Sequence, residues 1–466
     1  MGRPLPFWTN GYFWLVALLL AYGLIVYALW KSGRVGADKP LSLLGPLLMV
    51  KTLRGRKAIE RVARFRRAWN VFGDVGIVLA FAGMVAMFAL LVYGAIAASR
   101  LPASEAPSLS TALSIPGLNP LLPLGYGLLA LVVGVVLHEL CHGVLARANG
   151  IRVKSLGVLF LVVPLGAFVE QDEEDMNAAT RRRRDRVAAA GVMANFALAV
   201  IFFLALSAVV GVSVQPKAAG VGVAAVFSGS GASNATLAPG DIVTGLNGTL
   251  TPDATVLGQV LSQARPGETV PLSFYSQAQG GTVETSVTLG AASAYLPSER
   301  GNRTAQRLAF LGIQEYPLAP QVLTGILVDP FHADLGGLSF RGNFPSPLTG
   351  SLLFLALPGT QMLPLGGTVG QFYTVSGPLG AGGTFVLVNA LYWLVWINFL
   401  LGIFNALPAV PLDGSFLFRD IVGGAIKRAQ PALPQPRVDA LVGGLSVLIS
   451  FTVLLLILWE FVGPFL

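Results

Sequence analysis

Residues 121–146 read LLPLGYGLLALVVGVVLHELCHGVLA, an apolar run interrupted by three ionisable side chains, His138, Glu139 and His142. A membrane-spanning helix needs roughly 20 apolar residues in succession, so this run is long enough to cross a bilayer. Ionisable groups inside such a helix are costly unless they are paired, bound to an ion or facing water. The stretch therefore predicts a membrane helix that carries a functional site.

The composition of the whole chain agrees with a membrane protein. Of the 466 residues, 54% are hydrophobic and 12% are charged, whereas about 25% charged residues is usual in soluble domains. The low charge and high hydrophobicity also exclude a disordered chain. A single cysteine, Cys141, excludes a disulfide framework and any metal cluster built from several cysteines.

Apolar runs of similar length occur elsewhere, and together they predict six membrane spans. The expected spans are 11–30, 71–98, 121–146, 187–212, 384–407 and 438–463. The first is too long and too aromatic for a cleaved signal peptide, so we expect it to remain as an anchor.

The distribution of lysine and arginine predicts the orientation of these spans. Segments 31–70, 147–186 and 408–437 hold eleven, eight and four of these residues, whereas 99–120 holds one and the long segment 213–383 holds six. Basic loops of membrane proteins face the cytoplasm, so both termini and segment 213–383 are expected outside it. Because the basic residues are split between loops rather than gathered on one folded domain, no nucleic-acid partner is expected.

Three glycosylation sequons agree weakly with this orientation. They begin at Asn234, Asn247 and Asn302, all inside the segment that the basic residues assign to the outside.

The sequence pattern changes between the fourth and fifth spans. Residues 219–290 contain Val-, Thr- and Ser-rich stretches separated by turn residues, which is typical of short strands. Residues 252–265 have apolar side chains at helical spacing. The run LAPGDIVTGLNG at 237–248 resembles the turn, strand and Asn-Gly turn of PDZ domains, which bind extended peptides at a sheet edge. The alternative is a small β domain without a peptide ligand.

The sequence HELCH at 138–142 is a candidate metal site. His138 and His142 lie one helical turn apart on the same face, so both imidazoles can bind one ion. Glu139 is then placed to take a proton from water at that ion. The alternative is a pair of histidines that hydrogen-bond between helices. Cys141 is expected to be a buried thiol, because a fourth protein ligand would exclude water.

Two histidines need a third protein ligand. His332 is the only other histidine, and it is expected outside the membrane. Asp413 is the better candidate, because it lies in NALPAVPLDG at 405–414, where Pro408 and Pro411 break the fifth span. Irregular backbone at membrane depth is tolerated where it lines a cavity or is buried in protein. The alternative is an aspartate that only caps the next helix.

These motifs together resemble the site-2 proteases, intramembrane zinc metalloproteases of peptidase family M50. The resemblance rests on HELCH at 138–142, AAGVMANF at 189–196, SGPLG at 376–380 and NALPAVPLDG at 405–414. They follow the order of the family's three-helix catalytic core, with a PDZ-like insert between the second and third helices. The resemblance covers roughly residues 120–300 and 375–425.

The resemblance implies a role for each site residue. It implies a zinc cofactor bound by His138, His142 and Asp413, catalysis by Glu139, and contact of Asn195 and Asn405 with the substrate strand. It implies that 156–170 is a membrane-associated hairpin that pairs with unwound substrate. The implied substrates are transmembrane proteins cut inside the lipid bilayer, with peptide or ectodomain contact through the PDZ-like domain. Because His138 lies late in a span that runs from outside to inside, the cut is expected near the cytoplasmic side.

The expected fold is an α-helical polytopic membrane protein with a three-helix catalytic core and a small β-rich PDZ-like domain inserted. The expected parts are two N-terminal membrane helices with a basic cytoplasmic loop (1–110), the first part of the core (120–212), the PDZ-like extracytoplasmic domain (219–290), an unassigned extracytoplasmic segment (300–375), the third core helix with the PLDG motif (376–430), and a C-terminal membrane helix (438–463).

Other functional classes fit the sequence less well. A zinc protease with a glutamate as third ligand and a catalytic domain outside the bilayer needs a suitable downstream glutamate, and Glu460 lies at the far end of the last span. No inverted repeats indicate a transporter. A non-enzymatic membrane receptor or chaperone that works through the PDZ-like domain is the main alternative, and the complete set of candidate metal ligands argues against it.

Overall fold

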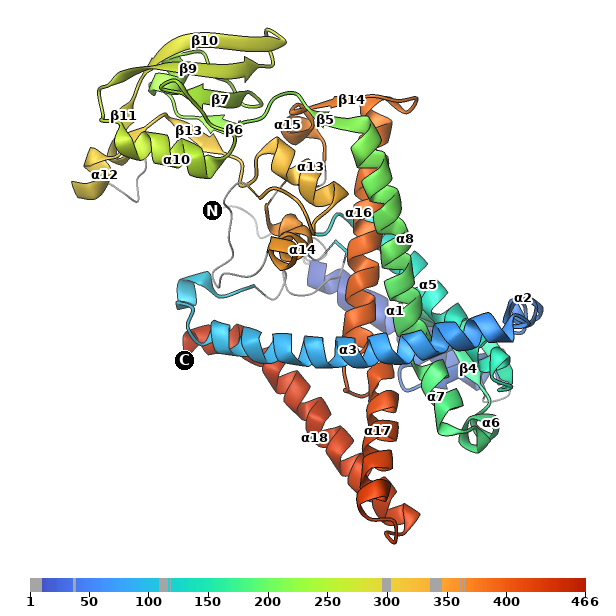
Figure 1. The fold of residues 1–466 in the computed structure, drawn as a ribbon. Helices are drawn as coiled ribbons and strands as arrows, with labels where there is room; N and C mark the ends of the chain where they lie inside the picture. Colours follow the sequence, from blue (N-terminus) through green and yellow to red (C-terminus); the bar gives the residue numbers. More distant parts are fainter. Residues whose placement is uncertain are drawn as a thin grey trace, which may run out of the picture. The chain divides into compact units, whose positions relative to one another are not determined.

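The computed structural model describes the chain as two compact units (Figure 1). The described residues are 11–36, 39–108, 116–117, 119–295, 303–335, 346–360, 362–363 and 365–466. The sequon at Asn302 lies outside them. The first unit comprises residues 1–112, 128–199 and 397–466, and the second comprises 113–127 and 200–396.

Five helical stretches among the described residues are long and apolar enough to cross a membrane. They are α3 (Arg66–Ala98), α5 (Leu124–Ala148), α8 (Ala190–Ser213), α16 (Gly380–Asn405) and the stretch Gln435–Phe465, which combines α18 (Gln435–Val462) with η5 (Gly463–Phe465). The first expected span is also helical, as α1 (Gly11–Lys31), but its described apolar part, Val16–Lys31, is shorter than a span. The sixth crossing therefore stays a prediction.

In the first unit, α3 packs closely against the helices that carry the motifs. A side chain at Gly73 would lie 2.9 Å from Arg186 and 3.1 Å from Leu145, and one at Gly76 would lie 2.8 Å from Met193. Small residues allow helices to approach each other closely within a membrane. These glycines therefore let α3 contact both α5 and α8.

An ion-pair cluster joins α3 to α7 (Arg181–Ala188). Each carboxylate oxygen of Asp74 accepts one hydrogen bond from Arg182 and one from Arg186. The distances are 2.8 and 3.1 Å for Arg182 and 2.7 Å for both bonds from Arg186. The side chain of Arg186 is only 13% exposed. Because such a paired guanidinium is costly to leave without its carboxylate, Asp74 determines where α7 lies on α3.

A four-stranded antiparallel sheet lies in the same unit. Its order is β1 (Leu41–Leu44), β2 (Leu47–Thr52), β3 (Val153–Leu161) and β4 (Val163–Gln171). The hairpin expected at 156–170 is β3 and β4. Strands β1 and β2, from the first basic loop, extend this hairpin, with Val50 opposite Val158; no pattern in the sequence predicted this pairing.

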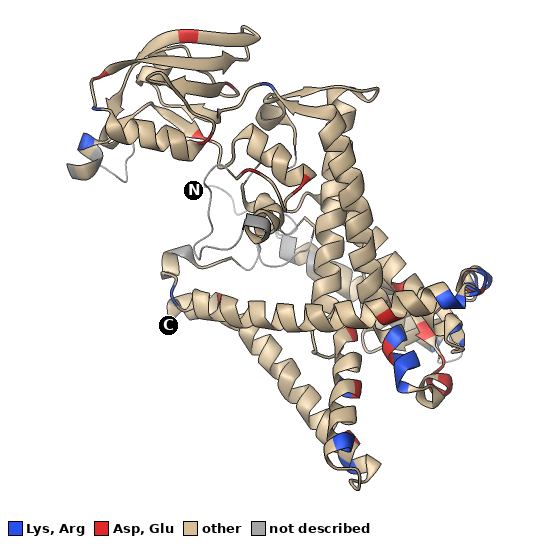
Figure 2. Cartoon of the chain, viewed as in Figure 1, with Lys and Arg blue, Asp and Glu red and all other residues tan. Residues whose placement is uncertain are grey.

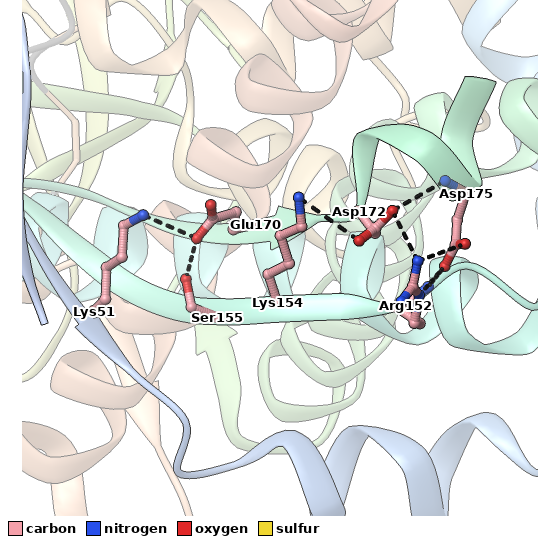
Figure 3. A network of polar contacts seen from close by, with 7 residues as sticks. All are labelled: Lys51, Arg152, Lys154, Ser155, Glu170, Asp172 and Asp175. Atoms are coloured by element: carbon pink, nitrogen blue, oxygen red, sulfur yellow. Dashed lines mark hydrogen bonds and ion pairs between the residues drawn. The ribbon is translucent and has the colours of Figure 1, made fainter. Parts of the chain in front are cut away.

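Charged side chains tie the strands of this sheet together (Figure 3). Lys51 of β2 pairs with Glu170 of β4 at 3.1 Å, and Ser155 donates a hydrogen bond to the same carboxylate. Burial alone would raise the pKa of Glu170, but the bonds from Ser155 and Lys51 hold that pKa below its usual value. Arg152 pairs with Asp175 of α6 (Glu173–Ala178) at 2.7 Å.

The second unit contains the expected β-rich region. Its main sheet has the order β10 (Gly281–Thr288), β9 (Thr269–Ser276), β7 (Ile242–Leu246), β6 (Val221–Val226) and β13 (Ile313–Glu315), and β8 (Thr249–Leu250) pairs with β7. Leu257 of α10 (Ala254–Gln263) joins the core of the sheet, beside Leu246 and Phe274. The strands and the helix expected within 219–290 are present, and the sheet continues past that range through β13.

The rest of the second unit packs along the first part of α16. Asn389 of α16 forms two hydrogen bonds with the backbone of Leu365, at 2.6 and 2.8 Å, and Tyr392 donates to the carbonyl of Phe354 at 2.8 Å. The segment left unassigned by the sequence analysis thus forms short helices held by buried polar side chains. Strand β14 (Tyr373–Val375) of this segment pairs with β5 (Val214–Pro216). The other elements are α12 (Arg303–Arg307), β12 (Ala309–Phe310), α13 (Pro320–Val328), α14 (Ser346–Ala356), η4 (Leu357–Thr360) and α15 (Gly367–Gly370).

Four other short elements of the described chain lie between the main helices and strands. They are η2 (Ala103–Glu105), α9 (Gly231–Asn234), β11 (Gly290–Ala291) and α11 (Ala292–Tyr295).

We predict that Asp74→Asn destabilises the protein by about 1–3 kcal/mol, because the amide cannot accept all four N–H groups and Arg186 keeps its charge without a carboxylate. The measurement is the midpoint of thermal unfolding in detergent micelles. Asp439→Asn is the matched control, since Asp439 is exposed and bonds to Gln435 on its own helix. Equal midpoints for the two variants would contradict the role given to Asp74.

Candidate metal centre

The two histidines of the HELCH motif meet on one face of α5. His138 and His142 are each 7% exposed, and their Nε2 atoms lie 3.2 Å apart. The helical period alone places them on one face. The packing of α5 against its neighbours buries them.

Asp413 reaches these histidines from the end of the turn that follows α16, as the first residue of α17 (Asp413–Ala429). Its Oδ2 lies 3.1 Å from Nε2 of both His138 and His142. A side chain at Gly414 would collide with the backbone carbonyls of Ala406 and Leu407. Only glycine at this position therefore lets the chain fold back after α16 and turn the neighbouring aspartate toward the histidines.

The spacing of the three donor atoms fits a zinc ion. His138, His142 and Asp413 form a group that could hold a metal, with donor atoms 3.1–3.2 Å apart. An ion placed about 2.0–2.2 Å from each, as zinc is from imidazole and carboxylate, spans these separations. Two imidazoles and one carboxylate are also a usual set for a catalytic zinc with one position open.

Gly191, near the start of α8, keeps room for such an ion. A Cβ at this position would collide with the His138 ring and with Nε2 of His142. Gly191 belongs to the AAGVMANF motif, from which no role for this glycine was predicted. The only sign of this role in the sequence is that a glycine stands inside an apolar helical segment.

Hydrogen bonds orient both imidazole rings. Nδ1 of His142 lies 2.7 Å from the carbonyl of Val187, to which it donates when Nε2 is the metal-binding atom. Nδ1 of His138 lies 3.0 Å from the amide of Asn195, a residue with no exposed surface. Such partners hold the rings of metal ligands in place. The structure thus places Asn195 directly behind His138.

Glu139 lies beside the donor atoms and against the sheet. It is half-buried, and its Oε2 accepts a hydrogen bond from the backbone N–H of Val169 at 3.3 Å. Val169 belongs to β4, the last strand in its sheet. The free edge of β4 therefore faces the residue expected to act in catalysis.

The other candidate residues lie elsewhere. Asn405 is half-buried and donates to the carbonyl of Leu401, one turn earlier in α16. Cys141 is a buried free thiol in an apolar cluster with Leu145. His332 pairs with Asp329 at 2.9 Å, three residues away. Neither Cys141 nor His332 belongs to the metal-binding group found among the described residues.

A cavity of about 1030 Å³ opens onto the donor atoms. Glu139, His142 and Asp413 line it, and charged side chains of α7 and α17 line it as well. Arg184 of α7 binds both carboxylate oxygens of Asp420 at 3.2 Å, and Arg181 pairs with Asp185 at 3.5 Å. Charged side chains therefore line the cavity next to the donor atoms.

Comparison with known proteins identifies the family. The model of peptidase family M50 matches residues 126–442, about two thirds of the chain. The chain belongs to peptidase family M50. Together with the five apolar helices, this membership makes it a site-2 protease-type peptidase and an integral membrane protein.

Two relatives of this M50 peptidase share about a quarter of their aligned residues with it. An uncharacterised protein of Methanocaldococcus jannaschii is 23% identical over 367 residues, which are 78% of this chain and 75% of the relative. A Clostridium perfringens protein whose name describes it as a candidate zinc metalloprotease is 25% identical over 340 residues, or 66% of this chain and 90% of the relative.

Part of the M50 peptidase is similar to solved structures, one of which is the PDZ domain of an SdrC-like protein from Listeria monocytogenes. This domain is 17% identical and covers 22% of this chain and 92% of its own, with a TM-score of 0.17. A TM-score this low carries no argument about the fold of the present chain.

We predict that the M50 peptidase loses stability as pH rises from about 4 to about 7, through one carboxyl group. Burial and the neighbouring Asp420 carboxylate raise the pKa of Asp185 from 3.8 to about 7. In this pH window the folded protein keeps a proton that the unfolded chain releases, so the free energy of unfolding falls with pH and levels off above about pH 7.

The measurement for this prediction is the unfolding midpoint from about pH 5 to about pH 8. Asp185→Asn removes the titrating group and should flatten this part of the profile, whereas Glu173→Gln, an exposed residue that lines the same cavity, should leave it unchanged. Parallel profiles for wild type and Asp185→Asn would show that Asp185 does not titrate in this range.

Proposed function

We propose that this M50 peptidase is an intramembrane zinc metalloprotease that hydrolyses peptide bonds within or near the transmembrane segments of membrane-protein substrates. The observation that carries this proposal is the meeting of His138, His142 and Asp413, with donor atoms 3.1–3.2 Å apart, next to Glu139. These residues belong to apolar helices or to the turn that follows one of them, so the reaction takes place at membrane depth.

Each residue of the centre has a distinct role in the proposed reaction. A zinc ion held by His138, His142 and Asp413 would act as a Lewis acid and make water nucleophilic near neutral pH. Glu139 takes the proton from the attacking water and passes it to the nitrogen of the leaving peptide. The open cavity beside Glu139 supplies that water. Asn195 and Val187 hold the two imidazoles in their orientation.

The edge of β4 is the proposed binding site for the scissile segment. An intact transmembrane helix keeps its carbonyls in internal hydrogen bonds, so the substrate must unwind before its backbone can react. An extended segment that adds to β4 has its backbone groups satisfied by the sheet. Because Val169 of β4 contacts Glu139, a segment bound at this edge passes the catalytic carboxylate.

Asn195 and Asn405 differ in this proposal. Asn195 is fully buried behind His138, which supports a role in orienting the ligand rather than direct contact with substrate. Asn405 is partly accessible where α16 ends, so we retain it as a substrate-binding residue.

The orientation in the membrane follows from the basic loops. We place the loops 31–70, 147–186 and 408–437 in the cytoplasm, with both termini and the β-rich domain outside, because these loops hold most of the lysine and arginine. The cut then lies near the cytoplasmic side. The β-rich domain acts as a PDZ-like module that contacts peptides or ectodomains of substrates before cleavage.

We predict that the purified protein binds about one zinc ion per chain and that His142→Ala loses most of it, because two remaining ligands hold zinc poorly. Metal analysis after dialysis gives the stoichiometry. His332→Ala is the matched histidine control, since His332 pairs with Asp329, and it should keep its zinc. Full zinc content in His142→Ala would remove this residue from the site.

We predict that Glu139→Gln lowers cleavage of a transmembrane substrate by about 10²–10⁴-fold while zinc stays bound, because an amide cannot accept and return the proton. The assay is a reconstituted cleavage reaction followed by metal analysis of the same sample. Glu284→Gln, an exposed position in β10, should cleave like wild type. Activity retained by Glu139→Gln with its zinc in place would rule out the catalytic role.

A further inference from the structure

A dense group of cations surrounds α2 (Arg56–Ala63), just before the membrane span α3. Among the described residues, none of these cations forms an ion pair with a carboxylate. We call this group the α2 basic surface, and it consists of Arg54, Arg56, Lys57, Arg61, Arg64, Arg66 and Arg67.

Other basic clusters of the same unit are compensated by acidic side chains. Figure 2 shows Lys and Arg at both α2 and α7, with Asp or Glu close to those of α7. Arg182 and Arg186 pair with Asp74, and Arg184 pairs with Asp420. In the sheet, Lys51, Arg152 and Lys154 pair with Glu170, Asp172 and Asp175 (Figure 3). The α2 basic surface differs because its positive charge is not neutralised within the described chain.

Large apolar side chains are exposed among these cations. Leu53 is 67% exposed, Phe65 is 59% exposed and Val62 is 42% exposed. The guanidinium of Arg64 lies over the Phe65 ring, 4.9 Å from its centre. Helices that combine exposed apolar side chains with cations lie in the membrane interface and bind anionic lipids more strongly than neutral ones.

The position of α2 in the chain agrees with this type of contact. Only Arg64 and Phe65 separate α2 from α3, the span that begins at Arg66. Clusters of four to eight cations directly next to a membrane span are attracted to anionic headgroups. The topology rule requires positive charge in this loop, but it does not require Leu53, Val62 and Phe65 to be exposed among the charges.

We propose that the α2 basic surface is a docking site for anionic phospholipid headgroups of the bilayer, with Leu53, Val62 and Phe65 inserted between the acyl chains. This inference is independent of the proposed protease reaction. The bound lipids supply negative charge to these cations, which form no ion pair with a carboxylate among the described residues; Glu60 of α2 itself pairs with Arg147.

The inner face of α2 connects this lipid site to the catalytic helix. Ile59 and Ala63 are buried in an apolar cluster with Val144 and Ala148 of α5. A further ion pair, Glu60 with Arg147 at 3.2 Å, links the same two helices.

Ile59 also packs against Gly143. A Cβ at Gly143, the residue after His142, would lie 3.0 Å from Ile59. Anionic lipid that holds α2 at the membrane therefore also stabilises the end of α5 that carries the histidines.

The test compares two triple variants of the full-length protein. Lys57→Gln/Arg61→Gln/Arg64→Gln neutralises part of the α2 basic surface. Arg183→Gln/Arg428→Gln/Arg437→Gln is the matched control, since these exposed residues lie in the other two basic loops and, among described residues, form no ion pair. Each protein is reconstituted into vesicles of phosphatidylcholine alone or of an equal mixture with phosphatidylglycerol, and its thermal unfolding midpoint is measured.

Phosphatidylglycerol should raise the midpoint of wild type and of the control, and the rise should shrink in high salt because the attraction is electrostatic. The α2 variant should lose most of the rise, and phosphatidylglycerol titrated into its micelles should bind on the order of tenfold or more weakly. A second variant, Leu53→Ser/Phe65→Ser, keeps the charges and should lose part of the rise.

Two results would overturn the proposal. One is an equal response of the two triple variants to phosphatidylglycerol. The other is that an acidic peptide raises the wild-type midpoint in phosphatidylcholine vesicles more than phosphatidylglycerol does, which would assign the surface to a protein partner.

Discussion

The meeting of two imidazoles and one carboxylate inside an apolar helical bundle is the constraint on which the rest of this unit depends. The three donor atoms lie 3.1–3.2 Å apart although Asp413 is 271 residues from His142 in the chain. Bringing such polar groups together among apolar helices is favourable only when each is paired or bound to an ion. Gly191 and Gly414 meet the steric side of this requirement, since a side chain at either position would collide with the centre or with the turn that forms it.

Parts of the chain outside the matched family region contribute to this centre. The carbonyl of Val187, which orients His142, follows directly after Arg186 in α7, and Asp74 of α3 holds that arginine. Strands β1 and β2 extend the hairpin whose last strand contacts Glu139. Helix α3 and the first basic loop thus help to hold the residues around the metal ligands in place. This matters because the rigidity of a metal ligand depends on the groups that bond to its ring.

The cavity and the sheet edge suit the two physical needs of the proposed proteolysis within a membrane. Hydrolysis consumes water, and a charged cavity that reaches Glu139 and His142 lets water enter. In the proposed reaction the substrate backbone leaves its helix, and the edge of β4 provides hydrogen bonds to the extended segment in place of those of the helix. Both features adjoin Glu139, which is where the proposal places water, scissile segment and base together.

Features that depend on local periodicity could be predicted from the amino-acid sequence alone. Helical spacing placed His138 and His142 on one face, apolar length located the helices of all five candidate spans, and alternating residues predicted the strands within 219–290. Asp413 was found because prolines break the helix within the motif at 405–414 that contains it. These signals are local, because the period of a helix or strand is imposed by the backbone of the segment itself.

Contacts between segments that are distant in the sequence could not be predicted and are seen only in the folded chain. No local pattern marks β1 and β2 as partners of β3, β13 as part of a sheet that begins ninety residues earlier, or Asn195 as the residue behind His138. Gly191 is one of 55 glycines in the sequence, and its importance appears only when the two histidine rings are seen against it. The physical reason is that such contacts depend on how whole helices pack, and packing is decided by the shapes of both surfaces together rather than by either segment alone.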